Sequence, residues 1–196
     1  MAHLLWIGKP VMPHTFAQTM FTAPVKDLQS RNGSRESYER LARRGASEQS
    51  LGQDEVDFIS ARDSFYLATV TPDGWPYIQH RGGPAGFLAA LDEHTLAFAD
   101  YAGNKQYISA GNLSVNDRVS LFLMDYVHRV RLKIIGHARI VERDSPEFAA
   151  LSERVMSERG AKVDRIYVIQ VIGFDWNCSQ HITPRFTAEE LSALDR

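Results

Sequence analysis

The sequence has a single cysteine, no long hydrophobic segment and little net charge, and each of these features excludes a class of protein. Cys178 is the only cysteine among 196 residues. An intrachain disulfide is therefore excluded, and a reducing compartment, the cytoplasm, is expected. Residues 1–10 lack a basic start followed by a long apolar run, so neither a signal peptide nor a transmembrane helix is predicted. A formal charge of −2 gives no reason to expect nucleic acid or a membrane as a partner.

Several common site motifs are also missing. Cys178 and His181 are spaced like two metal ligands, but no second pair accompanies them, so no metal site is predicted. Cys178 is better explained as an inert thiol than as a nucleophile. The glycines between Gly82 and Gly86 do not have the spacing of a dinucleotide-binding motif, and no Gly-Lys-Ser/Thr motif of a phosphate-binding loop occurs.

The overall amino-acid composition is typical of a globular protein. Hydrophobic residues make up 44% and charged residues 23% of the chain, enough for one domain with extensions. We expect residues 1–49 to form an N-terminal arm and helix, and residues 50–196 to form the main domain. Residues 1 to about 30 are interrupted by prolines and are expected to be extended, lying on another surface such as a second subunit. Ser34 is suited to cap a helix that continues to Arg44.

The main domain is predicted to be mainly β with peripheral helices, an α+β fold. Runs rich in β-branched and aromatic residues, separated by turn signals, predict at least six strands at 65–70, 75–81, 96–99, 119–124, 129–141 and 166–172. Closely spaced antiparallel strands favour a small barrel, which also protects sheet edges.

One polar stretch between two of these strands is a candidate anion site. The loop Gly103–Gln106 leads into a helix expected to begin at Tyr107–Ser109, which places backbone N–H groups beside Lys105. Such a helix start favours a phosphate. An ordinary polar connection with a capped helix explains the loop equally well.

Several segments together resemble the FMN-binding split-barrel proteins related to pyridoxamine 5′-phosphate oxidase. These are His80-Arg-Gly-Gly-Pro84, Phe98–Leu113, Asn116-Asp-Arg-Val119 and Arg131–Gly136 followed by Ala138. Trp176–Arg185 resembles the C-terminal motif of a subgroup, the predicted flavin-nucleotide-binding proteins. The resemblance covers about residues 50–186 and implies a split barrel, here six-stranded and antiparallel. It also implies a homodimer with FMN at the subunit interface.

The resemblance also implies which residues contact the flavin. Four residues on one strand would line the isoalloxazine edge: Gln79, His80, Arg81 and Gly82. The phosphate loop and helix would correspond to Asn104, Lys105, Gln106, Tyr107 and Ser109. Arg131 would supply a polar flavin contact, and Trp176 and Arg185 would reach the flavin from the other subunit.

The implied activity is that of an FMN-dependent oxidoreductase acting on a small molecule. The basic C-terminal segment that grips the substrate phosphate in the true oxidase has only His181 and Arg185 as counterparts here, so vitamin B6 oxidation is not predicted. No acid or base stands out as catalytic. A flavin carrier without turnover is an alternative, as is a haem- or deazaflavin-binding relative on the same barrel.

Overall fold

A computed structural model of the chain describes residues 16–44, 50–155, 161–176 and 180–194. Three helices come first: α1 (Phe16–Met20), α2 (Ala23–Arg31) and α3 (Arg35–Arg44). Helix α4 (Gln53–Ser60) precedes the sheet, and three short helices occur later, α5 (Ile108–Leu113), α6 (Phe148–Ser152) and α7 (Ala188–Leu194). No helix among the described residues has the length and apolar character needed to cross a membrane.

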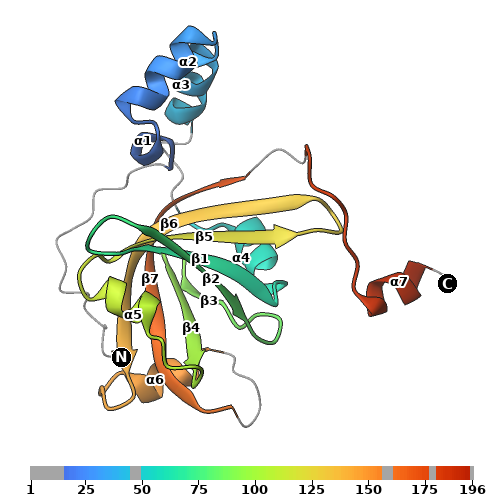
Figure 1. Ribbon diagram of the computed structural model, residues 1–196. Helices are drawn as coiled ribbons and strands as arrows, with labels where there is room; N and C mark the ends of the chain where they lie inside the picture. Colours follow the sequence, from blue (N-terminus) through green and yellow to red (C-terminus); the bar gives the residue numbers. More distant parts are fainter. Residues whose placement is uncertain (1–15, 45–49, 156–160, 177–179, 195–196) are drawn as a thin grey trace.

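The strands form one antiparallel sheet that does not close, in the order β2-β1-β5-β6-β7-β4-β3 (Figure 1). They are β1 (Ser64–Val70), β2 (Pro76–Gly82), β3 (Ala89–Asp92), β4 (Thr95–Tyr101), β5 (Arg118–Asp125), β6 (Val130–Glu142) and β7 (Val163–Trp176). This mainly β arrangement is consistent with the expected split barrel, and all six predicted strands are present.

The predicted number of strands is wrong, because the sheet has seven. The additional strand, β3, has the sequence Ala-Ala-Leu-Asp and lacks the β-branched and aromatic residues that identify a strand. It pairs with β4 through a two-residue connection, Glu93-His94, which contains no glycine or asparagine to indicate a hairpin. Pairing with β4, rather than the composition of the segment, therefore makes it a strand.

The core lies inside the curved sheet, and burial alternates along β1 and β5, whereas β4 and β7 contain runs of four buried residues. On β1, Phe65, Leu67 and Thr69 are buried, while Tyr66 points to the outer face and is 40% exposed. The long strands β6 and β7 bend at a bulge next to Gly136, where a Cβ would lie only 2.4 Å from the carbonyl oxygen of Gln170. Glycine is therefore required for this close approach. A smaller apolar cluster on β4, β6 and β7 packs against α6.

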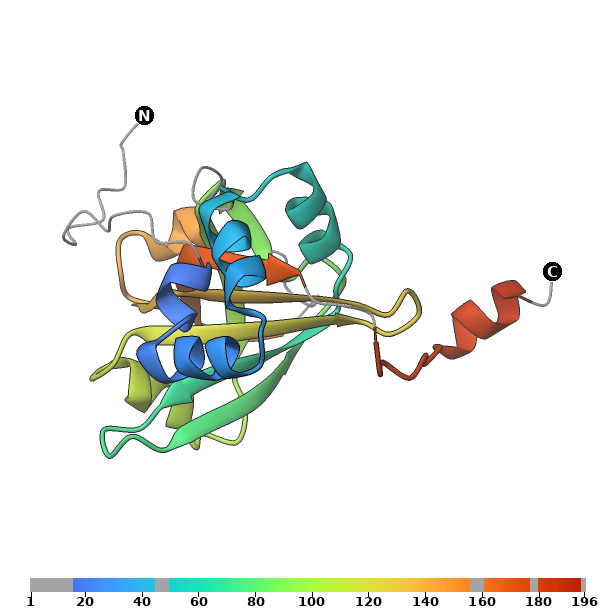
Figure 2. The ribbon, with the colours of Figure 1, turned by 90° about the horizontal axis from the view of Figure 1, so that it is seen from above.

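The N-terminal helices stand beside the sheet as a separate layer (Figure 1). Residues 16–20 and 23–31 are helical, so the prediction of an extended arm is wrong there. Pro24 is compatible with α2 because it occupies the first turn, where a missing N–H costs little. The predicted helix after Ser34 is present as α3. Helix α1 contacts the barrel, with the Phe16 ring 4.9 Å from Lys133 Nζ. Figure 2 shows α7 projecting away from the barrel at the other end of the chain.

Candidate functional site

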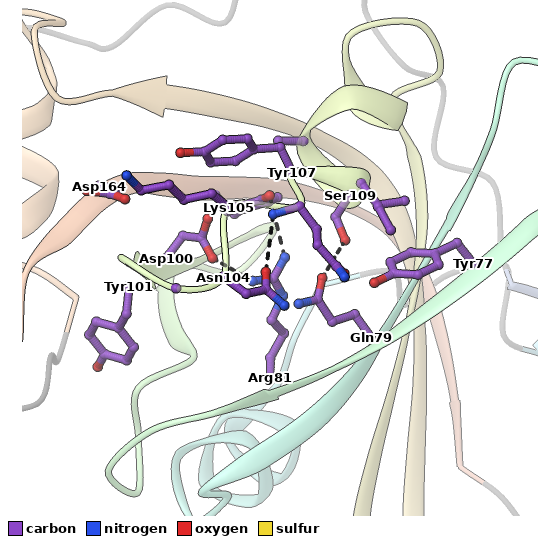
Figure 3. Close-up of a pocket in the computed structure, with 15 residues that line it drawn as sticks. Tyr77, Gln79, Arg81, Asp100, Tyr101, Asn104, Lys105, Tyr107, Ser109 and Asp164 are labelled. Atoms are coloured by element: carbon purple, nitrogen blue, oxygen red, sulfur yellow. Dashed lines mark hydrogen bonds and ion pairs between the residues drawn. The ribbon is translucent and has the colours of Figure 1, made fainter.

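The candidate site is a pocket between the edge strand β2 and the strands β4 and β7, covered by the loop that connects β4 to α5 (Figure 3). It brings together seven of the residues that the sequence identified as candidates for flavin binding. These are Gln79, Arg81, Asn104, Lys105, Gln106, Tyr107 and Ser109. Residues that lie 30 positions apart in the sequence therefore form one site.

The alternation of β2 decides which of its side chains reach the pocket. Tyr77, Gln79 and Arg81 line it, whereas His80 lies on the opposite face of the strand. There its ring packs against Tyr66, with ring centroids 5.7 Å apart. Successive side chains of a strand point to opposite faces, so of the four predicted residues Gln79–Gly82 only two, Gln79 and Arg81, direct their side chains into the pocket.

Arg81 is the central cation of the pocket. Its Nη1 donates to Asp100 Oδ1 at 2.5 Å, and its Nη2 lies 3.5 Å from the Tyr167 hydroxyl. The guanidinium also lies over the rings of Tyr167 and Phe98, at 5.1 and 5.6 Å. Both members of the ion pair are largely buried, with side-chain exposures of 12% for Arg81 and 18% for Asp100.

Burial changes the acidity of two groups around Arg81. It raises the pKa of the Asp100 carboxyl, and the positive charges of Arg81 and Arg165 offset this increase only in part. Burial also raises the pKa of the Tyr167 hydroxyl, and the negative charge of Asp100 adds to the effect. The tyrosine therefore stays neutral at physiological pH.

The loop over the pocket has an unusual backbone. Lys105 and Tyr107 both have positive φ, 60° and 53°, in the left-handed region that non-glycine residues rarely adopt. The Asn104 side chain stabilises the turn, because its Oδ1 accepts a hydrogen bond from the Gln106 backbone N–H at 3.2 Å. Strain of this kind is concentrated at functional sites.

Two side-chain hydrogen bonds fasten the helix that follows this loop. Ser109 Oγ donates to Gln79 Oε1 at 3.0 Å and ties α5 to β2 (Figure 3). Asn112 Nδ2 donates to Thr69 Oγ1 at 2.9 Å and ties the same helix to β1. The predicted helix after Tyr107 is confirmed, and its orientation toward the pocket is fixed by these contacts.

The donors of the pocket fit a phosphate group. Arg81 and Lys105 are cationic, and the side chains of Gln79, Asn104 and Ser109 add amide and hydroxyl groups. Arg81 Nε is buried and has no hydrogen-bond partner among the described residues. An unpaired buried donor in a pocket that also contains a lysine favours an anionic oxygen ligand.

The remaining predicted contacts lie elsewhere in the single chain. Arg131 is on β6, and its Nε is buried without a hydrogen-bond partner in the described ranges. At the end of β7, Trp176 Nε1 donates to Glu55 Oε1 at 2.7 Å, and its ring packs on Phe58 at 4.8 Å. Arg185 lies over the Tyr126 ring at 4.8 Å. Since the sequence predicted that Trp176 and Arg185 act on the other subunit, their roles stay predictions.

Sequence reasoning missed five polar side chains that line the pocket: Tyr77, Asp100, Tyr101, Asp164 and Tyr167. The alternation of β2 was a usable signal for Tyr77, which lies two residues before Gln79. Asp100 and Tyr167 gave no local signal, because their proximity to Arg81 depends on the packing of β4 against β7. The possible metal ligand Cys178 lies outside the described residues, and the described residues contain no cluster of potential metal ligands.

Comparison with known proteins supports the resemblance found in the sequence. Residues 51–177 match a family model described as pyridoxamine 5′-phosphate oxidase. A comparison with curated proteins gives no match.

Solved structures from three bacteria are also similar. HupZ from Group A Streptococcus is 16% identical, with a TM-score of 0.48, and the match covers 69% of this chain and 98% of that one. An FMN-binding protein from Syntrophomonas wolfei is 12% identical, with a TM-score of 0.48 and coverages of 76% and 97%. A protein of the pyridoxinephosphate oxidase family from Clostridium acetobutylicum, related to general stress protein 26, is 11% identical, with a TM-score of 0.46 and coverages of 70% and 94%. At these TM-scores the likenesses carry no functional conclusion.

Proposed function

Because this chain belongs to the pyridoxamine 5′-phosphate oxidase family, we propose that it is a flavoprotein that binds FMN in the pocket between β2, β4 and the β4–α5 loop. The observation that carries the proposal is the convergence of Gln79, Arg81 and the loop Asn104–Tyr107 on one pocket. These residues come from two separate segments, and both segments carry the family resemblance. We further propose a cytoplasmic location, which rests on the single cysteine of the sequence.

The residues present would divide the binding of FMN among them. Lys105 and Arg81 would neutralise the phosphate, and the Asn104 amide would supply a further hydrogen bond. Gln79 is held by Ser109 and would orient the flavin edge along β2. When bound, the flavin supplies hydride or electron transfer, while the chain contributes binding, orientation and exclusion of water.

We propose that the functional unit is a homodimer that completes this site. On the outer face of β1 and β2, Tyr66 is 40% exposed and Ile78 is 64% exposed, and the two are diagonal neighbours across the strand pair. Trp75 at the preceding turn is 74% exposed. Exposed apolar groups that gather in this way mark an interaction surface. This face lies on the opposite side of β2 from the pocket, so the partner's Trp176 and Arg185 would have to reach the flavin past this edge strand.

An oxidoreductase acting on a small molecule is the activity proposed for this dimer, and a flavin carrier is the second candidate. The carrier is favoured by one observation: Asp100 and Tyr167, the buried ionisable groups of the pocket, both contact Arg81 instead of offering a free acid or base. A haem protein is a further candidate: of the usual haem ligands, the described residues lining the pocket include tyrosine but no histidine, cysteine or methionine.

Purification of the protein in the presence of FMN tests the binding proposal. We expect a yellow protein with flavin absorbance that releases FMN on heat denaturation. A preparation with a haem spectrum, or one that retains no flavin at micromolar concentration, would contradict it. Anaerobic mixing with NADH or NADPH then distinguishes the two activities. The flavin absorbance of an oxidoreductase should be lost rapidly as the flavin is reduced, whereas the flavin of a carrier should stay oxidised.

A further inference from the structure

Arg165 on β7 is a buried cation whose contacts are incomplete. Its side chain is 14% exposed, and its Nε has no hydrogen-bond partner in the described part of the chain. The nearest carboxylate oxygens, Asp100 Oδ2 and Glu142 Oε2, lie 3.9 and 3.7 Å from this nitrogen, beyond hydrogen-bonding distance. A buried guanidinium with such weak pairing is costly unless the site uses its charge.

Asp100 cannot neutralise both arginines that flank it. The strand register places Asp100 of β4 directly opposite Arg165 of β7, but its short contact is with Arg81 at 2.5 Å. Glu142 is opposite Arg165 on the other side, and its side chain is 55% exposed, so that water screens its charge. Asp164 also lines the pocket, but its ion pair is with Lys162 at 3.8 Å, so Arg165 has no close carboxylate partner of its own among the described residues.

Tyr107 connects Arg165 to the pocket. The guanidinium of Arg165 lies 4.9 Å from the centre of the Tyr107 ring, and Tyr107 lines the pocket. Tyr107 has the left-handed φ of 53° described above and is 49% exposed, so its own burial does little to hold it in place. The cation–π contact supplies that restraint from behind.

We propose that Arg165 is a positioning residue that makes this pocket select a phosphate monoester. It fixes the Tyr107 ring from behind, and it adds the positive charge that Asp100, committed to Arg81, leaves uncompensated. This inference rests on the proposed FMN site and extends it to a residue outside the pocket lining and outside the family motifs of the sequence.

Paired measurements with FMN and riboflavin test the proposal, because the two ligands differ only in the phosphate. Dissociation constants are measured by flavin fluorescence for the wild type, Arg165→Gln and Arg165→Lys. We expect Arg165→Gln to weaken FMN about tenfold while riboflavin changes less than about twofold. Arg165→Lys keeps the charge but loses the planar group, so its affinity for FMN should lie between those of the wild type and Arg165→Gln.

Lys162→Gln is the matched control for charge. Lys162 lies three residues before Arg165, its side chain is 71% exposed, and its ion pair with Asp164 is long, at 3.8 Å. We expect its FMN affinity to equal that of the wild type. An equal loss for Lys162→Gln and Arg165→Gln would mean that net charge alone is responsible, and would overturn the positioning role.

The remaining outcomes separate this inference from the proposed function. Equal losses of FMN and riboflavin in Arg165→Gln, or an unchanged FMN affinity, would overturn the role of Arg165 while leaving the flavin site intact. If Arg165→Gln does not fold, Arg165→Lys decides by the same criterion of selectivity. A wild-type protein that binds neither flavin would remove the proposed function together with this inference.

Discussion

Arg81 on β2 and Asp100 on β4 form an ion pair between two strands that share no backbone pairing. The sheet runs from β2 at one edge to β3 and β4 at the other, so this contact joins its two ends across the opening of the barrel. The pocket lies at this junction. Stability of the barrel and geometry of the site therefore depend on the same pair of side chains.

Asp100→Asn tests this dependence. Removing the carboxylate leaves the Arg81 guanidinium buried without its partner, and the free energy of unfolding should fall by about 3 kcal/mol. Hydrogen exchange should rise first in β2, because β1 is its only neighbouring strand in the sheet. Urea denaturation and exchange measurements check both effects. The comparison variant is Glu147→Gln, which breaks the more exposed pair with Arg139 and should cost less. Equal losses for the two variants would argue against a special role for Arg81–Asp100.

Lys105→Ala tests the phosphate contact of the loop. Lys105 lines the pocket, and a charge-assisted contact to phosphate contributes roughly 1.5–3 kcal/mol. FMN affinity should therefore fall by roughly tenfold or more, while riboflavin affinity hardly changes. Isothermal titration with both ligands provides the measurement. Similar losses for both ligands would show that Lys105 acts on the fold of the loop and not on the phosphate.

Ile78→Glu tests the proposed dimer face. Ile78 is 64% exposed on the outer face of β2, and a carboxylate there would have to be buried if a second copy covers it. We expect sedimentation velocity to show a monomer that has lost most of its flavin affinity. Val115→Glu is the matched control, since Val115 is 67% exposed and lies beyond the end of α5. A dimer that persists in Ile78→Glu would exclude this face as the interface.

Trp176→Ala tests the contact proposed across the dimer. The Trp176 ring is 38% exposed, and within its own chain it is held by Glu55 and Phe58. If its free face covers the partner's flavin, the variant should remain dimeric, bind FMN more weakly and show higher flavin fluorescence. A lower melting temperature of the flavin-free protein with an unchanged flavin spectrum would instead assign Trp176 to the packing of α4.

The acid stability of the barrel should depend on Asp125. Burial by itself would raise the pKa of this carboxyl, but the backbone N–H and ring of His128, together with Arg62, outweigh it and leave the pKa lowered. A lowered pKa in the folded state stabilises the protein above the unfolded value of 3.8, and this stability is lost as pH falls through the folded pKa. Asp125→Asn should therefore lower the melting temperature at pH 7, and the difference from wild type should shrink below about pH 4. A difference that is constant with pH would contradict this.

The sequence was most informative where local chemistry determines structure. β-branched and aromatic runs identified six strands, and the polar loop before Tyr107 identified the helix and one side of the pocket. β3 was missed because its Ala-Ala-Leu-Asp sequence has no strand preference of its own. Short segments of this kind take their conformation from a neighbouring strand.

Only part of the site was predictable, because some of its residues are brought together by strand alternation and by the pairing of distant strands. The motif from Gln79 to Gly82 is continuous in the sequence, but a strand sends alternate side chains to opposite faces, so only Gln79 and Arg81 line the pocket. Asp100 and Arg165 face each other only because β4 pairs with β7. A contact across 65 positions of sequence depends on the topology of the sheet, which no local pattern contains.

The position of β2 at the sheet edge has a consequence for how this site can be mapped by mutation. An edge strand keeps one row of peptide N–H and C=O groups unpaired by any neighbouring strand. A flat heterocycle with its own donors and acceptors is complementary to such a row. Alanine scanning does not detect hydrogen bonds between a ligand and the main chain, because every substitution to alanine preserves the peptide group. Substitution of residues 77–81 by ester-linked analogues, or by proline at alternate positions, would therefore reveal binding energy that side-chain replacement leaves undetected.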